Sequence, residues 1–381
     1  MENASQSSRL PGLDFLRAIA IVWVMLFHER SDPMPTFLRP IAGFGWMGVD
    51  LFFVLSGYLI ASQLLKPYAQ GGKPSLRDFY LRRFFRIIPV YWAVLAFYIF
   101  FPKLVEDSHL TAIWKFLTFT QNLLFDYRYE RGFAHAWSLC IEEHFYLLLP
   151  CIVFVLMIKP SLRKAAGFLA AVLIAQIAIR CWIWHSVLLP RWGSEDFAST
   201  YFQRIYYPTY SQLDGLIMGV TLASIKVFRP EWWRRMTAHG HLWLLAGLLL
   251  MALDIALFKG PLNLSTAIGF TVQALGMACL LISSVSTNGW LARYRIPGAA
   301  ATATLAYSLY LTHPAVMHLA RTYLGPHFKY QPFTIPLVFF MSTFMVAGVM
   351  YWCIERPFLK LRERISAGMK PATGTLSAAS Q

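Results

Sequence analysis

Apolar runs long enough to cross a bilayer follow one another through most of this chain. A spanning helix needs about 20 mainly apolar residues. Only 14% of the 381 residues are charged, whereas a soluble domain carries about 25%. A soluble globular enzyme is therefore excluded, and we predict an all-α polytopic membrane protein with about ten transmembrane helices. The expected spans are 13–28, 46–65, 84–101, 139–158, 165–185, 206–225, 241–258, 267–285, 303–319 and 335–354.

The positive charges predict which loops face the cytoplasm. The chain has 34 Lys and Arg residues against 19 Asp and Glu residues, a net charge of +15. With a cytoplasmic N-terminus, 21 of the basic residues fall in inner segments and 11 in outer ones. Because Lys and Arg are enriched in cytoplasmic loops, we expect both termini inside. Such loops attract anionic membrane lipid, and we expect no nucleic-acid partner.

The segment 110–125 is a rival eleventh span. It is fairly apolar, but it contains Lys115, Gln121 and Asn122. If it crossed, every later loop would change sides and the basic cluster at 226–235 would lie outside, against the positive-inside tendency. We therefore expect this segment to lie at the outer interface or to re-enter the membrane.

The expected organisation is one membrane domain with short ends. Residues 1–12 form a polar N-terminal segment, and residues 13–358 form the transmembrane domain. The first apolar run contains Arg17 and lacks a small-residue cleavage site, so we expect a retained helix and no removed signal peptide. Residues 359–381 are expected to be a disordered cytoplasmic tail with no appended soluble domain.

Two ionisable residues share one face of the first expected helix. Arg17 and His28 are eleven residues apart, which corresponds to about 16 Å along the axis and about 20° around it. Ionisable groups inside a span are costly and usually functional. The alternative is that Arg17 reaches lipid phosphate and His28 only ends the helix at the outer interface.

A polar stripe is predicted on the fourth span. Ser138, Glu142 and Tyr146 follow one another at intervals of four residues, whereas Glu143 points elsewhere. A carboxylate near a helix N-terminus is favoured by the helix dipole whatever the function, so one of the two glutamates can be structural. We favour a functional role for Glu142, which can polarise an imidazole or a hydroxyl substrate.

Three arginines, Arg82, Arg83 and Arg86, lie at the inner end of the third span. Charges at this position commonly anchor a helix at anionic lipid. Arg82 and Arg86 are also four residues apart, so they share a face and could grip a polyphosphate from the cytosol.

Asp214, Asp254 and His313 are further ionisable groups within expected spans. Tyr310 precedes His313 by three residues, a spacing that is also typical of plain helix packing. His313 and His318 are five residues apart, which does not match the i, i+4 spacing of a helical metal pair. We expect no metal site.

Jointly and in order, these residues resemble the acyltransferase 3 family of integral-membrane acyltransferases, whose members modify cell-surface polysaccharides and other hydroxylated molecules. Arg17 and His28 form the R-x10-H pattern of that family. The chain departs from the family pattern at Gln212, where many relatives carry an arginine. The matching segments are 13–28 with Asp14, 45–60 with Asp50, 82–89, 137–146, 213–216 with Asp214, 307–313 with Tyr310 and His313, and 354–357.

The resemblance implies acyl transfer, usually of acetyl, from cytoplasmic acyl-coenzyme A (acyl-CoA) to a hydroxyl of a carbohydrate acceptor at the bacterial inner membrane. Acyl-CoA is then a co-substrate, with no permanently bound cofactor. His28, oriented by Glu142, is expected to be the general base or to be transiently acylated. The anionic nucleotide is expected at Arg17, Arg82, Arg83 and Arg86. The pantetheine arm is roughly as long as the Arg17 to His28 spacing, so the thioester could reach His28. The expected supporting residues are Asp14, Asp50, Ser138, Tyr146, Asp214, Tyr310 and His313.

A transporter, such as a flippase for a lipid-linked sugar, is the main alternative. It shares the apolar composition and the buried charges. Transporters often contain repeats with broken helices in the two halves, and no repeat is visible in this sequence. Acceptor recognition is expected in the aromatic-rich outer segments 103–137 and 187–205, while the oligomeric state is left open.

Overall fold

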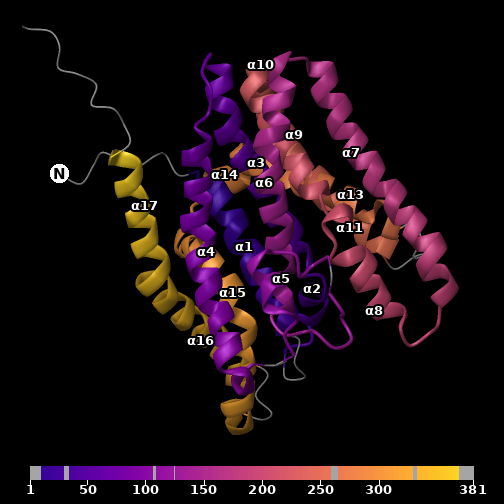
Figure 1. The fold of residues 1–381 in the computed structure, drawn as a ribbon, viewed down its shortest axis with the longest axis vertical. Coiled ribbons are helices and arrows are strands. Elements are labelled where there is room, and N and C mark those ends of the chain that lie inside the picture. The colour runs from indigo at the N-terminus through magenta and orange to yellow at the C-terminus, as the bar shows by residue number, and fades with distance from the viewer. Residues whose placement is uncertain are drawn as a thin grey trace, which may run out of the picture.

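The computed structural model describes residues 10–29, 34–105, 109–123, 125–258, 265–328 and 333–368, and these residues form helices and turns without any strand. The all-α prediction is confirmed. Figure 1 shows the helices as a bundle, with α7 and α17 at opposite edges and α1 and α3 between them. The longer helices are α1 (Pro11–His28), α3 (Met47–Ala69), α4 (Leu76–Phe100), α6 (Trp137–Ile158), α7 (Leu162–Ile183), α9 (Asp214–Phe228), α10 (Pro230–Thr237), α11 (Gly240–Phe258), α13 (Phe270–Val285), α15 (Ala299–Tyr323), α16 (Thr334–Met350) and α17 (Arg356–Gly368).

Short helices and single turns connect these elements. Four of the turns have π-helical geometry, in which one extra residue widens the helix. The π-helical turns are η3 (Trp184–Leu188), η5 (Phe202–Tyr206), η7 (Ser265–Gly269) and η9 (Tyr351–Glu355). The short α-helices are α2 (Arg39–Gly43), α5 (Ile113–Leu117), α8 (Phe197–Tyr201) and α14 (Trp290–Arg293). The 3₁₀ turns are η1 (Pro102–Leu104), η2 (Ala134–Ala136), η4 (Leu189–Arg191), η6 (Thr209–Ser211) and η8 (Gly325–Phe328).

Seven helical stretches within the described ranges are long and apolar enough to cross a membrane. The number becomes eight if α10 and α11, which meet at 79°, are counted together. Two of the ten predicted spans do not reach this standard. The helix α9 has only 15 residues, and α15, with 25 residues, is less apolar than the seven. The structure therefore supports a multi-pass membrane protein with seven or eight such helices.

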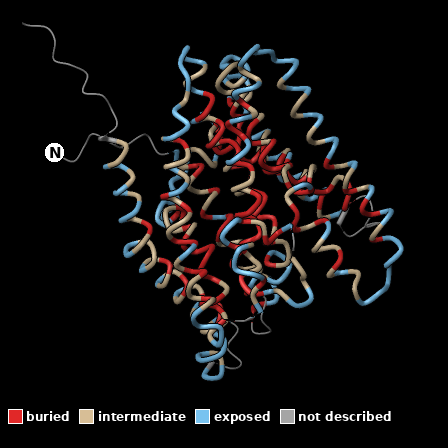
Figure 2. Tube along the Cα trace, in the orientation of Figure 1, coloured by how far each residue is buried: buried red, intermediate tan, exposed pale blue. Residues whose placement is uncertain are grey.

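Large apolar side chains point outward from several helices. Leu147 and Phe154 of α6, Ile174 of α7 and Met341 of α16 are all more than half exposed. Figure 2 shows that buried residues gather in the centre of the bundle and that exposed residues follow the helices at its edges. An outer surface of this kind is unfavourable in water and suited to lipid, where helices satisfy their own backbone hydrogen bonds.

The centre of the bundle is α3, which packs against α1, α6, α9 and α13. Glycines allow α3 and α9 to approach closely. A Cβ atom at Gly57 would lie 2.2 Å from the carbonyl oxygen of Leu216, and one at Gly219 would lie 2.3 Å from that of Val54. Small residues at such contacts bring helix backbones together in membranes.

The Gly219→Ala variant is expected to be destabilised by about 1–3 kcal/mol, the usual cost of overpacking. The new methyl group would force α9 away from the backbone of Val54 and Tyr58. The thermal unfolding midpoint of the purified protein in detergent measures this effect. Gly167→Ala in α7 is the matched control, because a Cβ there meets no atom within 4 Å. Equal midpoints for the two variants would contradict the proposed close contact.

The expected C-terminal tail begins later than predicted. Residues 359–368 belong to α17, so the prediction of disorder is wrong for them. The ring of Phe358 packs against Phe85 of α4 with a centroid distance of 6.4 Å, and Ser366 donates a hydrogen bond to Asp78. This contact with α4 holds the segment as a helix. Residues 369–381 and residues 1–9 lie outside the described part of the chain.

The segment 110–125 does not cross the bundle as a helix. Its only helix within 109–123 is α5, with five residues. Phe116 of α5 is fully buried, and its carbonyl oxygen accepts a hydrogen bond from Tyr91 of α4. The segment therefore folds back against α4, in agreement with the choice of no eleventh span.

Candidate active site

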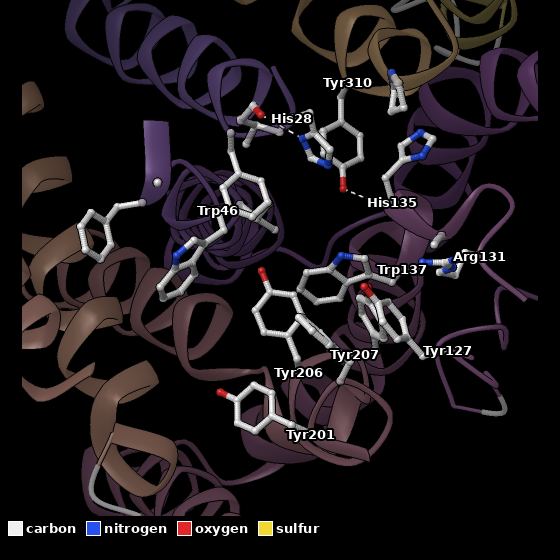
Figure 3. A pocket seen from close by; sticks show the side chains of 18 of the residues that line it. His28, Trp46, Tyr127, Arg131, His135, Trp137, Tyr201, Tyr206, Tyr207 and Tyr310 are labelled. Carbon is white, nitrogen blue, oxygen red and sulfur yellow. Dashed lines mark hydrogen bonds between the residues drawn. The ribbon is translucent and has the colours of Figure 1, made fainter. Parts of the chain in front are cut away.

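A cavity of about 1230 Å³ with mainly aromatic walls lies at the His28 end of α1. Figure 3 shows the rings of Trp46, Trp137 and Tyr206 between His28 on one side and Tyr201 on the other. The π-helical turns η5 and η7 contribute Tyr206 and Ser265 to the lining. Known ligand pockets measure roughly 300–1,000 Å³, so this cavity has room for a substrate.

His28 is held by a second histidine. Its Nδ1 lies 2.9 Å from the carbonyl oxygen of Val24 and 3.3 Å from Nε2 of His313 on α15. Nδ1 of His313 faces two carbonyl oxygens, those of Leu309 at 3.1 Å and Tyr310 at 2.8 Å. In the neutral rings, His313 therefore carries its proton on Nδ1 and accepts from Nδ1 of His28. This arrangement leaves the basic lone pair of His28 on Nε2.

Tyr310 and Ser138 lie beside this histidine pair. The Tyr310 hydroxyl donates to the carbonyl oxygen of His135 at 2.6 Å and accepts from the Ser138 hydroxyl at 2.5 Å. The His135 ring is 5.7 Å from the His313 ring, measured between centroids. Four residues from α1, α6 and α15 that the sequence singled out, namely His28, Ser138, Tyr310 and His313, are thus brought together, and His135 joins them.

Glu142 does not take the predicted place beside His28. It accepts a hydrogen bond from Tyr146 at 3.0 Å, and the Tyr146 hydroxyl also contacts Ser56 of α3. The contact expected from Glu142 is made by His313. Glu142 does not reach His28 because it lies one helical turn beyond Ser138 along α6, where the neighbouring helix is α3. The predicted stripe is nevertheless continuous, with Ser138 beside Tyr310 of the cavity wall and Tyr146 about 12 Å further along the axis.

The three arginines of α4 have different surroundings. Arg82 donates two hydrogen bonds to Asp78, at 2.9 and 2.6 Å. Arg86 is paired with the fully buried Glu355, which also accepts from Ser308 at 2.6 Å. Arg83 forms no ion pair with the described residues.

Among the residues that the structure describes, only neutral side chains contact the Arg83 guanidinium. It donates to Gln63 at 3.3 Å, while its buried Nε has no partner in this part of the chain. Arg83 also lies over the Tyr146 ring, 5.7 Å from its centroid. Of the three arginines of α4, Arg83 is the best able to bind an incoming phosphate, because no described carboxylate forms an ion pair with it.

Arg17 lies near this inner group. Its nearest carboxylate, that of Asp14, is 4.0 Å away, and its side chain is 38% exposed. Arg83, Arg86 and Tyr146 are within electrostatic range of it. The α1 helix thus carries a loosely paired cation at one end and a histidine in the cavity at the other.

Asp50 and Asp214 lie apart from both groups. Asp50 accepts a hydrogen bond from Gln273 of α13 at 2.7 Å. Asp214 binds both terminal nitrogens of the fully buried Arg180, at 2.7 and 3.2 Å. Arg180 also donates to the carbonyl oxygens of Ser211 at 2.9 Å and of Ala267 at 3.1 Å. It therefore supplies from α7 the guanidinium partner of Asp214, which makes this pair structural.

No individual role is predicted from the sequence for several lining residues, although one of them, His135, falls within the segment 103–137 expected to recognise the acceptor. His135, Trp46, Tyr206, Tyr207 and Gln273 all line the cavity. Their rings are close, with 4.9 Å between the centroids of Trp137 and Tyr206. Aromatic residues in outer loops also match an ordinary interfacial belt, so no signal in the sequence separates the two uses.

Ion pairs connect two of the loops near the cavity. Asp196 lies 3.1 Å from Arg128 and 3.6 Å from Arg191. The Ser194 hydroxyl, with smaller contributions from Arg128 and Arg191, holds the pKa of the Asp196 carboxyl below its ordinary value. These contacts connect the loop that carries Tyr127 to the one that precedes α8.

The fold and these sites define a multi-pass helical membrane protein with an aromatic cavity next to a histidine pair. The acyltransferase 3 family model, described as an acyltransferase domain, matches residues 10–354. The chain belongs to this family, and the resemblance drawn from the sequence is confirmed.

Relatives with known names agree with the family. A Staphylococcus aureus (strain COL) protein named "Putative O-acetyltransferase SACOL0978" is 27% identical over 92% of this chain and 57% of its own length. "O-acetyltransferase OatA" of S. aureus (strain NCTC 8325 / PS 47) is 31% identical over 57% of this chain and 34% of its own length. The chain thus spans at most 57% of the length of these relatives. No solved structure matches the chain.

Proposed function

We propose that this protein transfers an acyl group, most simply acetyl, from acyl-CoA to a hydroxyl of a carbohydrate acceptor. The observation that carries the proposal is the arrangement of α1 and α6. Arg17 and the unpaired Arg83 lie at one end, His28 lies in the cavity at the other, and the Ser138 to Tyr146 stripe runs between them. The family and the O-acetyltransferase names of the relatives support the same reaction.

The donor would enter from the arginine end. Its diphosphate would bind Arg83 and Arg17, because guanidinium groups bind phosphate through strong, charge-assisted hydrogen bonds. Arg82 and Arg86 are already bound by carboxylates and would contribute less. The pantetheine arm would then run along the polar stripe and bring the thioester to His28.

The transfer itself would use His28 as general base. Its Nε2 takes the proton of the acceptor hydroxyl, and the hydroxyl oxygen forms an ester bond with the acyl carbon. The carbon–sulfur bond breaks, and the proton passes from His28 to the leaving thiolate. His313 keeps the imidazole in the tautomer that this step requires.

The proposal includes a topology. With the arginine end in the cytoplasm, both termini are cytoplasmic and the cavity faces outward. The chain would then cross the bacterial plasma membrane ten times, with α9 and α15 as the two less apolar spans. The excess of Lys and Arg in the segments at the arginine end supports this orientation.

With water or an added sugar as the hydroxyl acceptor, the purified protein is expected to release free thiol from acetyl-CoA. Arg83→Gln is expected to raise KM for acetyl-CoA about tenfold or more, the equivalent of one lost charge-assisted hydrogen bond. The effect on kcat is expected to be smaller, because Arg83 is distant from the reacting atoms. A thiol-reactive dye measures both parameters.

Arg234→Gln is the control for Arg83→Gln. Arg234 is an exposed residue of α10 that pairs with Glu231, and its loss is expected to leave KM unchanged. A flippase releases no thiol, so absence of thiol release by the wild-type protein would overturn the proposed function. An unchanged KM in Arg83→Gln would overturn only the donor site.

A further inference from the structure

One carboxylate in the cavity has no partner. Asp254 is the only acidic residue of α11, it is 97% buried, and it lines the aromatic cavity. Within the described ranges it receives no hydrogen bond and forms no ion pair. A charged side chain placed within an apolar helix costs about 2.5–3.5 kcal/mol, so an unpaired one is expected to serve a ligand.

Asp254 lies at the end of the cavity away from His28. It is within electrostatic range of Tyr201, which Figure 3 places on the far side of Tyr206 from His28. The α11 carboxylate has space because residue 269 is a glycine, since a Cβ there would lie 3.0 Å from Oδ1 of Asp254. The aromatic rings of Trp46, Trp137 and Tyr206 line the cavity between its two ends.

A second acceptor lies at the same end. Gln273 donates its Nε2 to Asp50, which fixes the orientation of its amide, and its buried Oε1 has no partner among the described residues. Asp50 is itself within electrostatic range of Asp254. This end of the cavity therefore offers oxygen atoms that accept hydrogen bonds, and the ligand must supply the donors.

Hydroxyl groups fit this site better than an ammonium group. Arg131 and Arg321 line the same cavity, whereas Asp254 is the only acidic residue among the lining residues described. The charge of the cavity thus does not favour a cation. Aromatic walls pack against the apolar faces of a sugar ring, and a carboxylate accepts hydrogen bonds from neighbouring hydroxyls.

We propose that the Asp254 end of the cavity is a binding subsite for a neutral hexopyranose unit of the acceptor, with a neighbouring unit placed at His28. The cavity volume of about 1230 Å³ allows more than one ring. This subsite rests on the proposed acyl transfer for its biological role, but its binding can be measured without acyl-CoA.

The test is direct binding to the purified protein in amphipol, since sugar-based detergents would compete. Maltotetraose, cellotetraose and tetra-N-acetylchitotetraose are titrated by calorimetry against the wild type, Asp254→Asn and the control Glu231→Gln, an exposed acid-to-amide change on α10. At least one tetrasaccharide is expected to bind the wild type. Asp254→Asn is expected to weaken that binding about tenfold or more, and Glu231→Gln is expected to leave it unchanged.

A second measurement does not depend on how the variant folds. The bound tetrasaccharide is expected to protect Asp254 of the wild type from carbodiimide labelling, read by mass spectrometry of its peptide. The subsite is refuted if none of the three sugars binds the wild type, if Asp254→Asn binds as well as the wild type, or if ethanolamine binds in preference. Thiol release from acetyl-CoA is scored separately, so a protein that cleaves acetyl-CoA but fails here loses only the subsite.

Discussion

The His28→Ala variant is expected to lose acyl transfer by about 10²- to 10⁴-fold, the usual contribution of a general base. The variant removes the imidazole that lines the cavity and contacts His313 through Nδ1. The KM for acetyl-CoA is expected to change little, because the proposed phosphate site lies at the opposite end of α1. The measurement is the rate of ester formation on the acceptor, together with the rate of thiol release.

The control is His144→Gln, which removes a different, half-buried imidazole. His144 contacts Thr209 at 2.8 Å and is not among the lining residues. It is expected to retain activity. Both variants should keep the thermal midpoint of the wild type, which separates chemistry from folding. A His28→Ala protein that is folded and fully active would eliminate His28 as the base.

The Arg180→Met variant is expected to be the most destabilised. Loss of the Arg180 guanidinium would leave Asp214 buried without its cation. Removing one partner of a buried ion pair costs about 3–5 kcal/mol. The carbonyl oxygens of Ser211 and Ala267 would lose their donors as well. The yield of folded protein and its thermal midpoint in detergent measure the effect.

Two further variants test the cause. Arg180→Met combined with Asp214→Asn removes both charges and is expected to recover part of the loss, as a double-mutant cycle would show. Arg191→Met removes an exposed arginine just after the same helix, whose pair with Asp196 at 3.6 Å is worth about 0–1 kcal/mol. If Arg180→Met matched Arg191→Met, the buried pair would have no structural weight.

The helices and the ends of α1 were predictable from the sequence because they depend on local spacing. Apolar runs predict helices in lipid, and a separation of eleven residues places Arg17 and His28 on one face. The same reasoning gave the stripe on α6. The family resemblance added the order of the motifs.

Contacts between distant helices were not predictable in this way. His28 and His313 are 285 residues apart, and their meeting depends on how α1 packs against α15. Glu142 was assigned to His28 because both are polar and near the outer side, but the pitch of α6 directs it to Tyr146 and Ser56. Arg180 and Asp254 each appear in the sequence as one charge in a span, and only packing shows that the first has a partner and the second has none.

The π-helical turns around the cavity have a consequence for how acceptor preference can change. Each turn holds one residue more than an α-helical turn, so removing one residue changes which side chains of that turn face the cavity. Deleting a single residue from η5 would therefore swing Tyr206 out of the wall while α3 and α9 keep their glycine contact. Single-residue insertions and deletions in η5 and η7 are thus a route by which the wall of the cavity can be reshaped while the packing of α3 and α9 is unchanged.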